Sequence, residues 1–208
     1  MHRSTVTARL LRAIAPAAMA ALVVAPASAD QLDAALAAEQ EALEAADAAL
    51  AEQRRNVLDY RQAVTELEVT EGAFAASLPE QLLGLGLALQ RSGDHPGAID
   101  AFKRGTHLAR INEGLYSTRQ LALLRGEIES LIAIGDLETA DERQRYLYRV
   151  QERTLSDRSR GEALMRQALW QRQAYEAGLG EAPQERLLRM WSLYRLALTD
   201  IMGAEGQE

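Results

Sequence analysis

The segment from Gln31 to Glu68 has the residue pattern of one long helix. It contains no proline or glycine, and it is dominated by alanine, leucine, glutamate and glutamine, which are all good helix formers. Apolar residues recur along it at intervals of seven, which is the spacing of one stripe of a coiled coil. That stripe consists of Leu36, Leu43, Leu50, Val57 and Val64. We therefore predict a long, alanine-rich N-terminal helix with one continuous apolar edge.

The second stripe that a coiled coil needs is incomplete in this segment. Its positions are occupied by Leu32, Glu39, Ala46, Gln53, Tyr60 and Leu67. The leucines of the first stripe are flanked instead by small residues, namely Ala35, Ala42 and Ala49. Such a helix can pair closely with a copy of itself or can lie back against its own chain. The sustained two-stripe pattern that would favour pairing is absent.

After Gly72 the pattern changes to short amphipathic helices separated by turns. We predict helices at about residues 77–92, 96–110, 117–134, 137–153, 157–177 and 183–202. Capping boxes formed by Ser77 with Glu80 and by Ser117 with Gln120 are predicted to start two of them. The last helix is predicted to bury one face, which consists of Leu187, Trp191, Tyr194, Leu198 and Ile201. A polar tail at residues 203–208 is expected to be flexible.

The chain contains an internal repeat. Five residues recur with a shift of 42 positions, a coincidence that chance rarely produces. The pairs are Leu82 with Leu124, Leu89 with Leu131, Gly93 with Gly135, Asp94 with Asp136, and Ala98 with Ala140. The repeat predicts two similar helical hairpins, and residues 157–202 match a hairpin in their helical pattern only.

The block from Pro79 to Arg110 resembles a tetratricopeptide repeat (TPR). The likeness lies in the signature positions of the two repeat helices, which are Leu82, Leu85, Gly86, Leu89, Ala98, Phe102 and Gly105. In such a hairpin Gly86 and Ala98 let the helices approach closely, and Phe102 fills the space toward the next pair. The chain departs from the family at Leu89, where a tyrosine is usual, and at Arg110, where a proline closes the repeat. Its period of 42 also exceeds the usual 34 or so.

This resemblance implies an all-α, TPR-like solenoid of helical hairpins that binds proteins or peptides on the surface formed by the first helix of each pair. In the first repeat that surface would comprise Glu80, Leu83, Leu87, Gln90 and Arg91. The stretch from His107 to Ser117 also resembles a sequence segment of uncharacterised exported proteobacterial TPR proteins, and this resemblance implies no biochemical activity. The segment linking the two repeats supplies further candidate partner-binding residues, namely Arg110, Asn112, Tyr116 and Gln120.

The N-terminal 29 residues have the layout of a cleavable signal peptide. Arg3, Arg9 and Arg12 precede an apolar stretch, and small residues at Ala27 and Ala29 fit cleavage before Asp30. The apolar stretch of roughly 13 residues is shorter than the 20 or so that a membrane span needs. We therefore expect a periplasmic or secreted protein that is not inserted in the membrane after cleavage. The predicted division is a signal at 1–29, a helical extension at 30–70, a repeat domain at 71–202 and the tail.

Charge and composition narrow the classes of partner. Removing residues 1–29 takes away three arginines and no acidic residue, which changes the net charge from −7 to −10. Binding to a nucleic-acid backbone or to an anionic membrane requires a basic face, so both are disfavoured as partners. The chain has no cysteine, so disulfides cannot contribute to its stability.

The candidate chemistry is sparse. Without cysteine, and with only His95 and His107 as histidines after cleavage, we predict no catalytic residue, no metal site and no cofactor. The favoured function is a periplasmic scaffold that binds an envelope protein or peptide through its helical repeats. One alternative is an oligomeric structural envelope protein assembled through the N-terminal helix, an arrangement similar to the periplasmic coiled-coil and repeat protein of the Tol-Pal machinery. A cell-wall hydrolase or transglycosylase is a more distant alternative.

Overall fold

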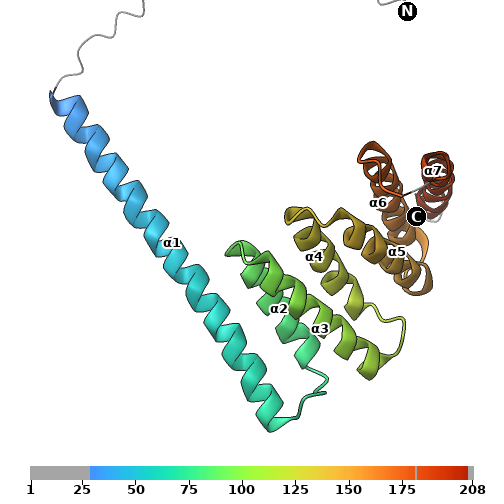
Figure 1. The fold of residues 1–208 in the computed structure, drawn as a ribbon, viewed down its shortest axis with the longest axis horizontal. Helices are drawn as coiled ribbons and strands as arrows, with labels where there is room; N and C mark the ends of the chain where they lie inside the picture. Colours follow the sequence, from blue (N-terminus) through green and yellow to red (C-terminus); the bar gives the residue numbers. More distant parts are fainter. Residues whose placement is uncertain (1–28, 181, 206–208) are drawn as a thin grey trace, which may run out of the picture. The chain divides into compact units, whose positions relative to one another are not determined.

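The computed structural model describes residues 29–180 and 182–205, and this part of the chain folds into seven α-helices without a β-strand. Figure 1 shows the helices in chain order. Their bounds are α1 Ala29–Thr70, α2 Leu78–Arg91, α3 His95–Glu113, α4 Arg119–Ala133, α5 Leu137–Thr154, α6 Asp157–Glu176 and α7 Pro183–Glu205. The prediction of an all-α chain with one long helix followed by six shorter ones is confirmed. The predicted signal peptide lies outside the described residues except for Ala29.

The chain divides into two units, at residues 1–45 and 46–208. Of the first unit the structure describes the start of α1, in which every side chain from Gln31 to Ala45 is exposed. In the second unit, successive helices pack as the hairpins α2–α3, α4–α5 and α6–α7, and each hairpin contacts the next (Figure 1). No helix among the described residues is long and apolar enough to cross a membrane.

The two predicted repeats end their first helices in the same turn. Gly93 and Gly135 have φ angles of +80° and +81°, a conformation that favours glycine. The next residue, Asp94 or Asp136, donates its backbone N–H to the carbonyl of Leu89 or Leu131 at 2.9 Å in both cases. Each aspartate then caps the following helix, because its side chain accepts the N–H of the residue three positions on. The sequence repeat is therefore also a repeat of backbone conformation.

The third hairpin has the same turn at the end of α6. Gly178 has a φ of +69°, and the N–H of Leu179 donates to the carbonyl of Ala174 at 2.9 Å. A leucine occupies the position of the capping aspartate, so α7 does not begin directly after the turn but at Pro183. The structural relation of the third hairpin to the other two is closer than its sequence indicates.

Phe102 occupies the centre of the packing between the first two hairpins. Its ring is fully buried between two glycines, Gly86 on α2 and Gly126 on α4. A Cβ atom built at either glycine would lie 2.3 or 2.4 Å from a ring carbon, so neither site has room for a side chain. The predicted close contact at Gly86 is confirmed, as is the complete burial of Ala98.

The C-terminal half of α1 packs against the first hairpin within the second unit. Val57 and Val64, which continue the leucine stripe, are buried in the same cluster as Leu82, Leu85 and other residues of α2 and α3. The ring of Tyr60 lies against Gly84, where an added Cβ would be 2.2 Å from it. Hence this half of the stripe is covered by its own chain.

Neither predicted capping box forms. The Ser77 side chain makes no capping hydrogen bond and its hydroxyl donates to Glu71 instead, because this acidic side chain at the end of α1 reaches it. The Ser117 hydroxyl accepts the N–H of Arg119 and donates to Glu113. Gln120 turns back to the carbonyls of Leu115 and Gly114, which the preceding loop leaves without helical partners.

The predicted core face of α7 is wrong in part. Trp191 and Leu198 are 60% and 51% exposed, whereas Leu193 and Ala197 are buried against α6. The small Ala197 allows close approach to Gly161, and this contact rotates α7 so that its largest side chain faces solvent. The helix also extends into the predicted flexible tail, as far as Glu205.

Candidate partner-binding surfaces

The first helices of the hairpins, α2, α4 and α6, line two grooves. The first groove, of about 330 Å³, lies between α2 and α4. It is lined by Pro79, Glu80 and Leu83 of α2 and by Thr118, Arg119, Ala122 and Leu123 at the start of α4. Its walls are mainly apolar, and one acidic and one basic side chain stand at its edge.

The second groove, of about 240 Å³, lies where α4, α5 and α6 meet. Ile132 and Leu169 are 41% and 37% exposed in its walls, and Arg125 and Arg166 also line it. Burial lowers the pKa of Arg125 below its usual value, as does the charge of Arg166, while the charge of Glu129 opposes the shift. The second groove thus combines two arginines with exposed apolar side chains.

Helix α4 joins the two grooves. Its exposed residues Ala122, Arg125, Glu129 and Ile132 follow at intervals of three or four and lie on one helix face. We call the two grooves and this connecting face the α2–α4–α6 surface.

The structure divides the five predicted binding residues of α2 between two roles. Glu80 and Leu83 line the first groove, and Leu87 and Arg91 are exposed. Gln90 is partly buried, and its amide donates to the Gly126 carbonyl at 2.9 Å and to the Ser130 hydroxyl at 2.8 Å. Gln90 therefore joins α2 to α4 and has little capacity left for a partner.

The predicted binding residues of the linking segment separate in the same way. Arg110 and Tyr116 are exposed, and Asn112 donates a long hydrogen bond of 3.4 Å to the Ala75 carbonyl. Gln120 is completely buried and accepts a hydrogen bond of 2.7 Å from the Tyr146 hydroxyl. Gln120 thus holds the linking segment in place and cannot reach a ligand.

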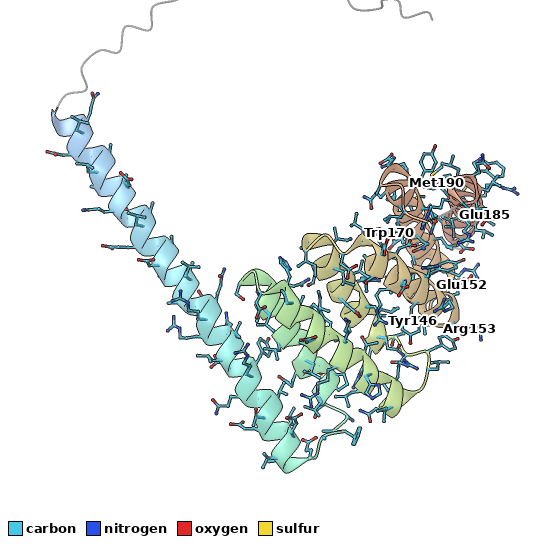
Figure 2. All side chains as sticks on the ribbon, viewed as in Figure 1. Tyr146, Glu152, Arg153, Trp170, Glu185 and Met190 are labelled. Carbon is cyan, nitrogen blue, oxygen red and sulfur yellow. The ribbon has the colours of Figure 1, made fainter. Side chains whose placement is uncertain are left out.

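Three arginines surround the ring of Tyr146 on α5, and helical periodicity alone did not predict this group. The guanidinium carbons of Arg110, Arg143 and Arg149 lie 5.9, 5.5 and 5.6 Å from its ring centroid. We call these four residues the arginine–tyrosine cluster. Next to it Arg153 lies 5.2 Å from the ring centroid of Tyr116, and Figure 2 shows Tyr146 and Arg153 on α5. In the sequence, only the spacing of Arg143, Tyr146 and Arg149 at intervals of three indicates that these side chains share one face of a helix.

Only one arginine of this cluster is neutralised. Arg143 donates to Glu127 at 2.6 Å, and Glu127 is completely buried. Burial raises the pKa of Glu127, although the charge of Arg143 and its hydrogen bond oppose the shift. Arg110 and Arg149 form no ion pair among the described residues.

A second buried charged group fixes the last three helices. Asp141 of α5 accepts from both terminal nitrogens of Arg186 of α7, at 3.0 and 2.8 Å, and from the indole N–H of Trp170 of α6 at 2.9 Å. Burial acts to raise the pKa of Asp141, but the hydrogen bonds from Arg186 and Trp170 prevail and hold it below the usual value. The bidentate geometry makes this ion pair specific as well as strong.

Among the described residues no three His, Asp or Glu side chains are placed to hold a metal ion. His107 is exposed on α3, and His95 is the first residue of the same helix rather than part of the preceding turn, where the sequence pattern placed it. The described surfaces offer shaped apolar grooves and guanidinium groups, which suit noncovalent binding of another molecule.

No protein-family model matches the chain, and no curated protein is significantly similar to it.

Proposed function

We propose that this protein is a TPR-type scaffold that is exported to the periplasm and binds an envelope protein or peptide through its α2–α4–α6 surface. The observation that carries the proposal is that the exposed face of α4, with its apolar and charged side chains, runs from the groove shared with α2 to the groove shared with α5 and α6. A solenoid presents the first helix of each repeat on one side, so successive repeats build an extended binding surface.

The grooves favour a helix or an extended peptide as the ligand. Leu83 in the first groove and Ile132 and Leu169 in the second offer apolar contacts, and Arg125 and Arg166 in the second offer hydrogen bonds to an acidic or carbonyl group. Binding modes of this kind use a few apolar anchors and fix orientation through polar groups at the rim.

Photocrosslinking tests this proposal. A photoreactive amino acid placed at Leu87 or at Ala122 should capture the same envelope protein in living cells. The purified partner should then bind the wild-type protein and lose at least tenfold in affinity for the Leu87→Glu/Ala122→Arg variant, because Ala122 lines the first groove and exposed Leu87 lies one helical turn beyond Leu83, which also lines it. Ala51→Arg, an exposed change on α1, is the matched control and should bind normally. Unchanged affinity of the groove variant would contradict the proposal.

Export is tested separately by the N-terminus of the mature protein. Mass spectrometry of the protein from a periplasmic fraction should identify Asp30 as the first residue. A protein that retains Met1 and remains in the cytoplasm would refute this part of the proposal.

A second candidate function is a structural oligomer assembled through α1. The leucine stripe favours it, because Leu36, Leu43 and Leu50 are 57%, 61% and 48% exposed, whereas Val57 and Val64 on the same stripe are buried. Light scattering of the mature chain should then give the mass of a dimer or trimer, and Leu36→Glu/Leu43→Glu should give that of a monomer. Leu58→Glu is the control, since Leu58 is 61% exposed but lies off the stripe. A monomeric wild-type chain would exclude this function.

A further inference from the structure

A third groove, of about 330 Å³, lies between the second helices of the last two hairpins, α5 and α7. Three arginines line it, Arg145 and Arg149 from α5 and Arg189 from α7, and no acidic side chain does. We call it the arginine groove. In a chain whose net charge is −7, a groove lined by three cations and no anion is a marked local exception.

These guanidinium groups are poorly neutralised. Arg145 lies 3.7 Å from Asp141, which is beyond hydrogen-bond distance, and both Asp141 oxygens accept hydrogen bonds from Arg186. Arg189 lies 3.8 Å from Glu185, and both side chains are at least 60% exposed, so their interaction is weak. Arg149 has no carboxylate partner among residues 29–180 and 182–205.

The positive surface extends beyond the groove. Arg149 belongs both to the arginine groove and to the arginine–tyrosine cluster, so Arg110, the other arginine of that cluster without an ion pair, continues the basic surface across α5 to α3. The hollow next to the groove does contain an acidic residue, Glu152, which lines it together with Tyr148 and Arg160. Figure 2 shows Glu152 beside Arg153 on α5.

The remaining walls of the groove select among anions. Tyr148, Leu193 and Leu196 make much of its lining apolar, and Gln171 adds a side-chain amide. An inorganic phosphate or a nucleic-acid backbone would gain nothing from the apolar walls, and the net negative charge of the chain would repel a polyanion at long range. A polypeptide that carries both carboxylates and apolar side chains would use both parts of the lining.

We infer that the arginine groove binds an acidic segment of a partner protein, in which Asp or Glu side chains pair with Arg145, Arg149 and Arg189 while neighbouring apolar side chains contact Leu193 and Leu196. This inference goes beyond the proposed function because the groove is formed by α5, α6 and α7, and neither Leu87 nor Ala122 lines it. The two surfaces can therefore fail their tests independently.

The test uses a fluorescein-labelled probe peptide of sequence EELLEELLEE and a matched peptide, QQLLQQLLQQ, that retains the leucines without the charges. Fluorescence anisotropy with the mature protein at low salt should detect the acidic peptide and give at least tenfold weaker binding for the matched peptide. Affinity for the acidic peptide should decrease as salt is raised, because exposed ion pairs are screened.

Two variants assign the binding to the groove. Arg149→Gln/Arg189→Gln should weaken binding of the acidic peptide at least tenfold. Arg195→Gln should leave it within twofold, because Arg195 is on α7 and lies 4.9 Å from the Trp191 ring centroid but does not line the groove. Circular dichroism should show that all three proteins are equally helical.

Three results would overturn the inference. One is equal weakening by Arg195→Gln and by the groove variant, which would indicate a general charge effect. The second is equal binding of the two peptides. The third is displacement of the acidic peptide by inorganic triphosphate at lower concentration than by its unlabelled form, which would identify a phosphate site instead.

Discussion

The ring of Phe102 shows how single residues determine the spacing of the hairpins. Because the helices have glycines, Gly86 and Gly126, where they meet the ring, α2 and α4 can both approach α3 closely. We expect Gly126→Ala to reduce the free energy of unfolding by about 1–3 kcal/mol, the usual cost of overpacking, despite the higher helix propensity of alanine. Urea denaturation followed by circular dichroism measures the loss.

The same substitution at Gly203 is the control, since no atom lies within 4 Å of a Cβ added there. Gly203→Ala should leave stability unchanged or raise it slightly. Combining Gly126→Ala with Phe102→Leu should cost less than the sum of the two single changes, because the smaller side chain makes room for the added methyl group. Strict additivity would show that the ring and the glycine are not coupled.

Asp141 is the residue on which the packing of α5, α6 and α7 depends most. Its side chain is 8% exposed and that of Arg186 13%. We expect Asp141→Asn to reduce the free energy of unfolding by about 3 kcal/mol, since it leaves the Arg186 charge without its counter-charge. Asp100→Asn, at an exposed position of α3, should have little effect in the same urea titration.

The lowered pKa of Asp141 also predicts a pH dependence. A carboxyl group whose pKa is lower in the folded state than in the unfolded state, where it is about 3.9, stabilises the protein above that unfolded value. This contribution is lost as the pH falls through the folded pKa. The difference in unfolding free energy between wild type and Asp141→Asn should therefore shrink between pH 5 and pH 3, and a constant difference would contradict the assignment.

At the scale of elements, the turn shared by the first two hairpins allows a matched comparison. Asp94 and Asp136 accept the N–H of Gly97 and Thr139 at 3.0 and 3.1 Å in the same geometry. Each of Asp94→Ala and Asp136→Ala should cost about 1 kcal/mol, the usual value for loss of an N-cap. Urea denaturation should give similar losses at the two sites, whereas a change at exposed Asp100 should cost much less. Clearly unequal losses would show that the turns are not equivalent.

These elements also show what the sequence could predict. The turns were located correctly because they depend on local interactions alone. Gly93 and Gly135 adopt a positive φ, and Asp94 and Asp136 cap the helix that follows. The serine capping boxes did not form because the N-cap positions, Ser77 and Thr118, have helical rather than extended backbone angles. The serine hydroxyls turn toward Glu71 and Glu113, to which they donate. A local motif does not reveal these backbone angles or the acidic side chain toward which its hydroxyl turns.

The binding surfaces were less predictable, for a similar reason. Leu83 and Leu87 could be placed by helical spacing, but Gln90 and Gln120 make hydrogen bonds to other helices and are structural. Arg110 of α3 lies against the same tyrosine ring, that of Tyr146, as Arg143 and Arg149 of α5. Only the packing of the two hairpins brings these side chains together, so helical periodicity alone does not show it.

At the scale of the whole second unit, the core consists of clusters shared between neighbouring hairpins. Residues of α1, α2 and α3 form one cluster, to which α4 contributes Leu123. A second cluster joins Ile99 of α3 to α4, α5 and α6, and a third joins α6 to α7. Because each hairpin contacts only its neighbours, a destabilising substitution in the last hairpin should affect the stability of the first hairpin only indirectly.

Gly161 allows this expectation to be tested. A Cβ at this position would lie 2.8 Å from Ile201 Cγ1 and 3.1 Å from the Ala197 carbonyl oxygen, so Gly161→Leu should force α6 and α7 apart. Hydrogen exchange measured by mass spectrometry should then be accelerated at least tenfold in peptides from α6 and α7, while α2 and α3 change little. The control is Gly203→Ala, because a Cβ added at Gly203 would have no atom within 4 Å. Equal acceleration of exchange in all hairpins would instead show that the second unit unfolds cooperatively. In that case a lower free energy of unfolding, caused at one interface, would speed exchange equally at every amide.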